Sequence, residues 1–199
     1  LGFVPPDEFI PISEDNGLIA TIGLWVLHRA CAQLKEWHQA GRSSLKLSVN
    51  VSYKQIVCTE LVDAVQACLA EHKLSGKSLV LELTERVFAE DLELVQKNIS
   101  LLAEMGVETA IDDFGIAYSS LSYLQNTDFS ILKIDRSFVN NITDDKAAFN
   151  LCLAIKPMSH SLDLKVTAEG IETQAHLTAL RAMDVDSYQG YFLSKPIDA

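Results

Sequence analysis

The sequence predicts an α/β protein of the (β/α)8 TIM-barrel type that lacks its first strand or strands. Short runs of β-branched and apolar residues alternate six times with longer stretches of helical periodicity. These runs recur at intervals of about 20–35 residues, which is typical of βα units with parallel strands and right-handed crossovers. A complete barrel needs about 250 residues and eight strands. The 199-residue chain offers six strand candidates, so we expect the missing strands at the front.

The expected elements follow one another in a regular order. The strand candidates are residues 45–51, 79–84, 107–112, 129–134, 164–168 and 187–192. The helix candidates are residues 17–40, 59–73, 88–105, 145–160 and 173–182, with shorter pieces after residues 118 and 136. In LLAEMGV (101–107), Gly106 ends a helix and Val107 opens the next strand. An open doubly wound sheet is the alternative, but no glycine-rich phosphate loop follows the first strand candidate.

Composition indicates an ordinary globular protein. The chain is 48% hydrophobic and 22% charged, and no linker-like or low-complexity segment divides it. We therefore expect one domain over residues 1–199, incomplete at the N-terminus and slightly so at the C-terminus. No apolar run reaches the roughly 18–20 residues of a membrane span, and no signal peptide is present. The expected location is the cytoplasm, although the parent protein could be membrane-anchored.

The net charge argues against binding of long nucleic acids, and the spacing of cysteines and histidines argues against a metal site built from closely spaced Cys or His ligands. A net charge of −11 argues against binding of long nucleic acids, which requires stripes of Lys and Arg. The cysteines form no CxxC pair, and we expect buried, reduced thiols; they are Cys31, Cys58, Cys68 and Cys152. The histidines show neither an HxxxH nor an ExxH pattern, and we expect structural or surface roles for all five; they are His28, His38, His72, His160 and His176.

Polar side chains end the inward-facing residue set of every strand candidate. Alternate residues of a strand point to opposite faces, and the strongly apolar set of each strand would pack under the helices. The other set points into the barrel and ends in a polar group: Asn50, Glu82, Asp112, Lys133, Glu169 and Gln189. In barrels the carboxyl ends of the strands carry the active site. These six groups therefore form the candidate site.

The chemistry of this set indicates a divalent metal. Three carboxylates and an amide oxygen are hard ligands, which suit Mg²⁺ or Mn²⁺ and not zinc. Among them, Lys133 could neutralise charge, hold a water molecule or form a Schiff base. The adjacent Asp112 and Asp113 need not share one role, because parity points Asp112 inward and turns Asp113 toward the following loop. The residues alone lead no further than an acidic metal site in a barrel.

Seven motifs along the chain resemble those of the EAL domain, the bacterial cyclic-di-GMP phosphodiesterase domain. They are GFVPPDEFIPISEDNGLI (2–19), LSVNVS (47–52), LELTER (81–86), AIDDFG with YSSLSYL (110–124), LKIDRSFV (132–139), TAEGIET (167–173) and QGYFLSKP (189–196). A single motif such as DDFG would be weak evidence. Their joint order and spacing cover almost the whole chain, which makes the resemblance specific.

The resemblance implies a TIM-type barrel that hydrolyses cyclic-di-GMP to linear pGpG with Mg²⁺ or Mn²⁺, as two ions. It implies metal-ligand roles for Asn50, Glu82, Asp112, Asp113 and Glu169. It makes Lys133 the catalytic lysine near the attacking water and Glu169 also a general base. Gln189, Glu85 and Glu172 are implied as substrate-binding or supporting groups, with Glu85 holding the loop after Asp113. Further implied partners are regulatory domains in the parent chain and a second copy in a homodimer.

Two departures from the family pattern bear on activity. The Glu-Ala-Leu segment and the Arg-Trp pair that follows it are absent and are expected upstream of Leu1. They would supply a metal-ligand glutamate and an arginine for a substrate phosphate, so we expect residues 1–199 alone to hydrolyse cyclic-di-GMP negligibly. In addition, the loop usually written GTGYSS reads GIAYSS here, with Ile116 and Ala117 at the altered positions. If the replaced glycine uses a positive φ, alanine strains the loop.

Three functional hypotheses follow. The first is an active metal-dependent phosphodiesterase in the complete domain. The second is a catalytically degenerate EAL domain that binds cyclic-di-GMP or a partner protein, which the altered loop favours. The third is an unrelated metal-dependent or Schiff-base barrel enzyme.

Overall fold

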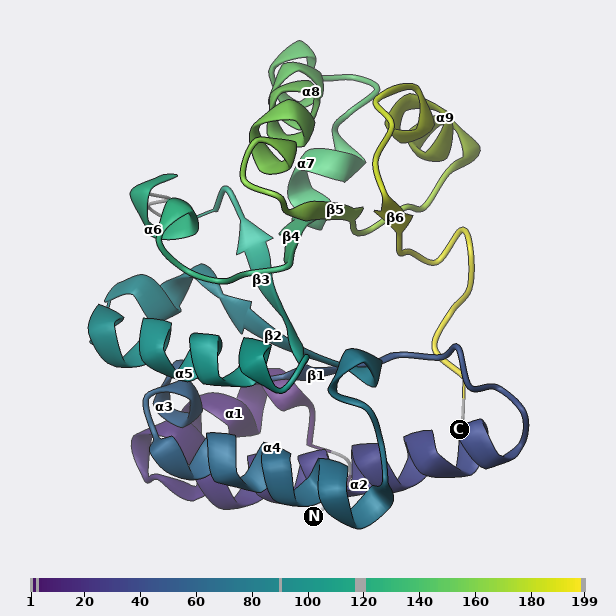
Figure 1. Cartoon of the computed structure of the whole chain (residues 1–199). Helices are drawn as coiled ribbons and strands as arrows, with labels where there is room; N and C mark the ends of the chain where they lie inside the picture. The colour runs from purple at the N-terminus through teal and green to yellow at the C-terminus, as the bar shows by residue number, and fades with distance from the viewer. Residues whose placement is uncertain (1, 3, 90, 117–120, 198–199) are drawn as a thin grey trace. The chain divides into compact units, whose positions relative to one another are not determined.

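The computed structural model describes residues 2, 4–89, 91–116 and 121–197, and the chain forms two compact units, Leu1–Glu108 and Thr109–Ala199 (Figure 1). The prediction of one domain over residues 1–199 stays a prediction. In the described part of the chain, no helix is both long and apolar enough to cross a membrane.

The first unit begins with helices and contains two parallel strands. Its elements are α1 (Pro6–Asp15), α2 (Leu18–Gln39), β1 (Leu47–Asn50), α3 (Tyr53–Ile56), α4 (Thr59–His72), η1 (Gly76–Ser78), β2 (Leu79–Thr84), η2 (Glu85–Ala89) and α5 (Leu92–Glu104). Strands β1 and β2 pair from Leu47 opposite Leu79 to Asn50 opposite Glu82. The carboxyl ends of the two strands therefore lie at the same edge of the ladder.

The core of the first unit lies where helices meet β2 and each other. Helices α2 and α4 pack side by side (Figure 1). Leu34 of α2, Val65 of α4 and Ile99 of α5 are fully buried. On β2, Leu81 and Leu83 are also fully buried, as expected for a strand covered on its apolar face.

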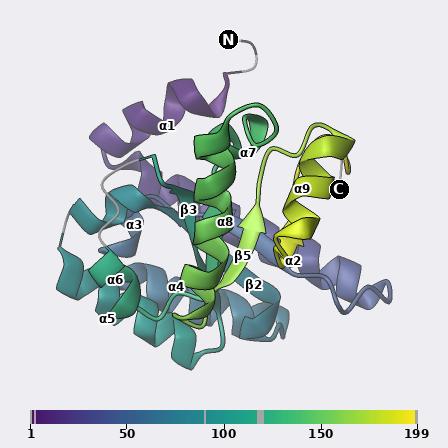
Figure 2. The ribbon, with the colours of Figure 1, turned by 90° about the horizontal axis from the view of Figure 1, so that it is seen from above.

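The second unit continues the alternation of strand and helix. Its elements are β3 (Glu108–Phe114, which starts at the last residue of the first unit), α6 (Leu121–Gln125), β4 (Ile131–Ile134), α7 (Arg136–Asn140), α8 (Lys146–His160), β5 (Lys165–Ala168), α9 (Gln174–Ala182) and β6 (Ser187–Tyr188). Strands β3, β4, β5 and β6 pair in parallel and in chain order. Helix α8 packs against β5 (Figure 2). Side-chain caps begin the helices: Asp135 starts α7, Asp145 starts α8 and Thr173 starts α9.

Most predicted elements are confirmed, and three points need correction. Two helices were not predicted: α1, which begins at Pro6 and contains Pro11, and the short α3. The last strand was predicted over residues 187–192, but β6 ends at Tyr188. Gly190 then turns the chain, and its carbonyl accepts hydrogen bonds from the N–H groups of Leu193 and Ser194 at 3.0 and 3.2 Å.

A polar cluster connects α8 to the segment before β6. The Lys156 ammonium lies 2.7 Å from the carboxylate of Asp186, and His160 lies 3.6 Å from it. The same carboxylate accepts a hydrogen bond from the N–H of Val166 at 2.7 Å. Burial alone would raise the pKa of Asp186, but these hydrogen bonds and the positive charges of Lys156 and His160 outweigh it and lower that pKa.

We expect Asp186→Asn to lower the free energy of unfolding at pH 7 by about 1–3 kcal/mol, because the substitution leaves Lys156 buried beside a neutral amide. A carboxyl whose pKa is lowered by folding stabilises the protein above its unfolded pKa of about 3.9 and loses that contribution as the pH falls below it. Urea unfolding at pH 7 and at about pH 3 measures this. The difference between wild type and variant should shrink at the lower pH, and an equal difference at both would contradict the assignment.

Candidate active site

Lys133 of β4 is the centre of the polar cluster at the carboxyl edge of the second unit's strands. Its ammonium lies 3.2 Å from Asp112 Oδ1 and 2.6 Å from Glu169 Oε1, and the residue is only 4% exposed. Asp112 lies on β3, and Glu169 directly follows β5. Because β4 pairs with both strands in parallel, the three side chains meet at one edge. This grouping was expected from the alternation of side chains along the strands.

A β-bulge separates the two adjacent aspartates. Ile111 lies opposite Leu132 and Phe114 opposite Ile134, so Asp112 and Asp113 together face the single residue Lys133. Asp113 adopts a φ of 58°, and its N–H donates to Asp112 Oδ1 at 3.0 Å. The two carboxylates have different neighbours, since Asp112 pairs with Lys133 whereas Asp113 shares a hydrogen bond with Asp135.

Negative charge accumulates around Asp113. Burial raises the pKa of its carboxyl, and the charges of Asp112 and Asp135 and a hydrogen bond with Asp135 raise it further, against the opposing effect of Lys133. Asp135 is itself buried and accepts the N–H of Ser137 at 2.8 Å as the cap of α7. A cation with oxygen ligands would relieve this accumulation. The donor set of Asp112, Asp113 and Glu169 thus fits Mg²⁺ or Mn²⁺ by chemistry.

The loop after β3 starts with a residue that must be glycine. Gly115 has a φ of 99°, and a Cβ there would lie 2.9 Å from the ring of Phe138. The next residue, Ile116, is 59% exposed. Ala117, the second altered position of the family loop, lies outside the described residues.

A cavity of about 430 Å³ opens beside Glu169. It is lined by Arg136, Glu169, Gly170, Glu172, Gln189, Gly190, Tyr191, Ser194, Lys195 and Pro196. Three residues of the predicted site, Glu169, Glu172 and Gln189, therefore share one cavity. Carboxylates and two cationic side chains on its wall give a surface that can hold an anionic ligand together with metal ions.

The two cationic residues of this cavity, Arg136 and Lys195, were not among the predicted site residues. Both lie inside quoted motifs, LKIDRSFV and QGYFLSKP. Neither occupies an inward strand position, so the parity argument could not select them. Their place within these two motifs was the available sequence signal.

Two glycines bring the walls of the cavity together. Gly170 has a φ of 69°, and a Cβ there would lie 2.3 Å from the Cβ of Arg136 and 3.0 Å from its Cα. At Gly190 a Cβ would lie 2.2 Å from the backbone N and O of Ile171, whose N–H donates to Gln189 O at 3.0 Å. Backbone groups, which cannot move aside easily, thus set the width of the cavity.

We expect Gly170→Ala to cost about 2–4 kcal/mol of unfolding free energy, since positive φ and a backbone clash both oppose the new methyl group. Gly17→Ala is the matched control, because Gly17 also has a positive φ of 80° but no atom within 4 Å of the position that a methyl group would take. It should cost only about 1 kcal/mol. Denaturant unfolding of both variants measures the difference, and equal costs would remove the clash from the explanation.

The remaining predicted residues belong to the first unit. Asn50 and Glu82 are register partners on β1 and β2, and the N–H of Val51 donates to Glu82 O at 2.8 Å. Glu85 begins η2 and is buried. The structure therefore brings Asn50 and Glu82 together within their own unit.

Comparison with known proteins gives consistent matches. The model of the EAL domain family matches residues 1–196. The bifunctional diguanylate cyclase/cyclic di-GMP phosphodiesterase MucR of Pseudomonas aeruginosa is 39% identical over 198 residues, which are 100% of this chain and 29% of that protein. The cyclic di-GMP phosphodiesterase NbdA of the same organism is 38% identical over 196 residues, 98% of this chain and 25% of that protein. The chain thus spans about a quarter of the length of these relatives.

Solved structures show the same fold. The MucR phosphodiesterase in complex with c-di-GMP aligns with a TM-score of 0.93 at 39% identity, covering 98% of this chain and 79% of that one. The EAL enzyme Bd1971, in its cAMP- and cyclic-di-GMP-bound form, aligns with a TM-score of 0.92 at 30% identity, covering 98% and 54%. The predicted fold class, an EAL-like α/β barrel type, is confirmed, with six strands in the described residues.

Proposed function

Because the chain belongs to the EAL domain family, we propose that the complete domain of which it is part is a metal-dependent phosphodiesterase that hydrolyses cyclic-di-GMP to linear pGpG, whereas residues 1–199 alone hydrolyse it negligibly. Relatives named as cyclic di-GMP phosphodiesterases support the reaction class. Family membership removes the hypothesis of an unrelated barrel enzyme. The observation that carries the proposal is the buried Lys133, held between Asp112 and the cavity-lining Glu169.

The proposed metal ligands are Asn50, Glu82, Asp112, Asp113 and Glu169, with Mg²⁺ or Mn²⁺ as two ions. When bound, such ions would neutralise the diester charge and favour ionisation of a water molecule. The donor set is composed of oxygen atoms, which these ions prefer. The raised pKa of Asp113 supports the same assignment, because a cation would stabilise the charged form that its surroundings disfavour.

The chain's own residues would perform the remaining steps. The carboxylate of Glu169 takes a proton from the attacking water, whose oxygen forms a bond to phosphorus while one ester P–O bond breaks. The leaving oxygen takes a proton from solvent water and becomes the free hydroxyl of the linear dinucleotide, and Glu169 releases its proton to solvent. Lys133 holds Glu169 and Asp112 in place and offers its N–H groups to the water or to the negative charge on the phosphoryl oxygens.

The cavity would receive the substrate. Arg136 and Lys195 on its wall can bind phosphate oxygens, and Arg136 can do so with two N–H groups. Gln189 and Glu172 offer an amide and a carboxylate for hydrogen bonds to the guanine edges or the ribose hydroxyls. Glu85 is proposed to support the loop after Asp113 from the first unit.

A second candidate is a receptor that binds cyclic-di-GMP without hydrolysing it. The observation that favours it is the exposed Ile116 in the loop that follows Asp113 and Gly115, where the family usually carries a hydroxyl residue. A receptor has no need of a proton acceptor and a buried lysine at the same edge, so the arrangement around Lys133 favours the enzyme.

The test is incubation of the complete domain with cyclic-di-GMP and Mg²⁺ or Mn²⁺, with product analysis by chromatography. The proposal expects pGpG, whose formation stops when the metal is chelated and resumes when it is restored. Calorimetry on the same sample separates the candidates. Binding without product after prolonged incubation with either metal would replace the enzyme by the receptor.

A further inference from the structure

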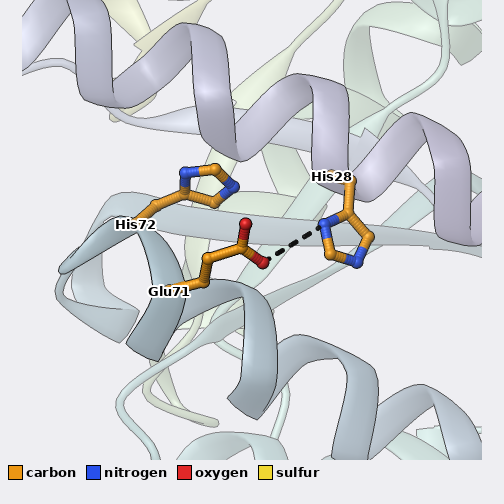
Figure 3. A group of neighbouring side chains, drawn as sticks. All are labelled: His28, Glu71 and His72. Carbon is orange, nitrogen blue, oxygen red and sulfur yellow. Dashed lines mark ion pairs between the residues drawn. The ribbon is translucent and has the colours of Figure 1, made fainter.

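His28, Glu71 and His72 form a cluster of metal-ligating side chains on the surface of the first unit. His28 lies on α2, whereas Glu71 and His72 are the last two residues of α4. One ligand atom from each lies within 4.8 Å of the others. The carboxylate of Glu71 lies between the two imidazole rings, with its Oε2 3.8 Å from His28 Nδ1 (Figure 3).

The backbone beneath this cluster is fixed by the core. Cys31 lies three residues after His28, and Cys68 lies four residues before His72; both are fully buried where α2 packs against α4. Burial raises the pKa of the Cys31 thiol to about 12, and burial also raises the pKa of Cys68. These protonated thiols are packing groups, so the ligand set is formed by the two imidazoles and the carboxylate.

We propose that His28, Glu71 and His72 bind one divalent transition-metal ion of the zinc class. Two imidazoles and one carboxylate, with a water in the fourth position, are a typical donor set for Zn²⁺. Mg²⁺ prefers oxygen ligands and does not select such a set. The carboxyl end of α4 also favours a positive charge.

The ligand atoms need only a small movement to reach coordination distance. Bonds of about 2.0–2.1 Å in a tetrahedral site put neighbouring ligand atoms about 3.3 Å apart, compared with 3.8 Å between His28 and Glu71. The side chains of His28 and Glu71 are 50% and 62% exposed, so both can rotate without disturbing the core. The bound ion would tie α2 to the end of α4. This site is independent of the proposed catalytic metals, whose ligands are oxygen atoms.

Calorimetric titration with Zn²⁺ tests the proposal, with excess Mg²⁺ present to occupy the carboxylate sites. The wild type should bind one equivalent more tightly than either His28→Gln or His72→Gln, each of which should weaken that equivalent at least tenfold. His160→Gln is the matched control, because His160 is an exposed histidine 3.6 Å from a carboxylate in the second unit. It should leave the Zn²⁺ isotherm unchanged.

A second measurement keeps folding and binding apart. Without zinc, each variant should still melt in one cooperative transition within a few degrees of the wild type, because His28 and His160 are exposed and His72 is only half-buried. With zinc, the melting temperature should rise by several degrees for the wild type and His160→Gln only, as binding to the folded state requires. Zinc isotherms that are the same for wild type, His28→Gln and His72→Gln would overturn the proposal. So would an equal loss in His160→Gln, which would indicate scattered binding to surface groups.

Discussion

Glu169→Gln is expected to lower the turnover of cyclic-di-GMP by the complete domain about 10²–10⁴-fold, the range typical of a lost general base. The amide keeps the shape of the side chain and can still accept a hydrogen bond from Lys133, whose ammonium lies 2.6 Å from the carboxylate in the wild type. It cannot take a proton from water. Initial rates of pGpG formation measure the loss, and calorimetry shows whether the substrate still binds.

The control for this variant is Asp163→Asn, which removes one carboxylate from an exposed turn between α8 and β5. Asp163 has a φ of 58°, a conformation that asparagine also tolerates. This control should retain wild-type turnover. A rate for Glu169→Gln within a few-fold of the control would remove Glu169 from the proton transfer.

Lys133→Met is the second substitution with a large expected effect. It leaves Asp112 and Glu169 facing each other across a buried apolar group, in place of the ammonium that lies 3.2 and 2.6 Å from them. Removing one partner of a buried ion pair costs about 3–5 kcal/mol of unfolding free energy. We also expect at least a hundred-fold loss of turnover, because the lysine is no longer present to stabilise the developing charge.

Lys156→Met separates the two effects. Lys156 is also buried and pairs with Asp186 at 2.7 Å, but it belongs to the polar cluster between α8 and the segment before β6 and is no part of the proposed site. Both variants should lose stability, measured by urea unfolding, while only Lys133→Met should lose turnover per folded molecule. If both lose turnover only in proportion to their unfolded fraction, Lys133 has a folding role alone.

The periodic spacing of apolar residues correctly predicted the helices and strands that have one regular apolar face. Strand β2 covers the predicted residues 79–84, and α2 and α8 begin and end within one residue of their predicted bounds. These segments have a regular apolar face that contacts the core. Helix α1 was missed because Pro11 lies in its interior, where proline usually opposes a helix, although Pro6 is favourable at its first position. The end of β6 was wrong because a close backbone contact at Gly190 ends the strand, and this contact has no sequence pattern.

The candidate site was predictable where it depends on strand alternation. Asp112, Lys133 and Glu169 were grouped because each closes an inward residue set on neighbouring parallel strands. Arg136 and Lys195 were not, because helix α7 and the C-terminal segment bring them to the cavity. The cluster of His28 with Glu71 and His72 was also missed. Its members meet through the packing of two helices and show no metal-binding spacing along the chain.

The bulge at Asp112 and Asp113 has a consequence for which substitutions the second aspartate can accept. The left-handed backbone at Asp113 is accessible to asparagine and glycine but costly for β-branched residues. Loss of charge and loss of backbone compatibility can therefore be varied separately at this one position. Among natural variants of the domain, asparagine at this position would alter charge with the least disturbance of the chain path, whereas valine would disturb the path itself.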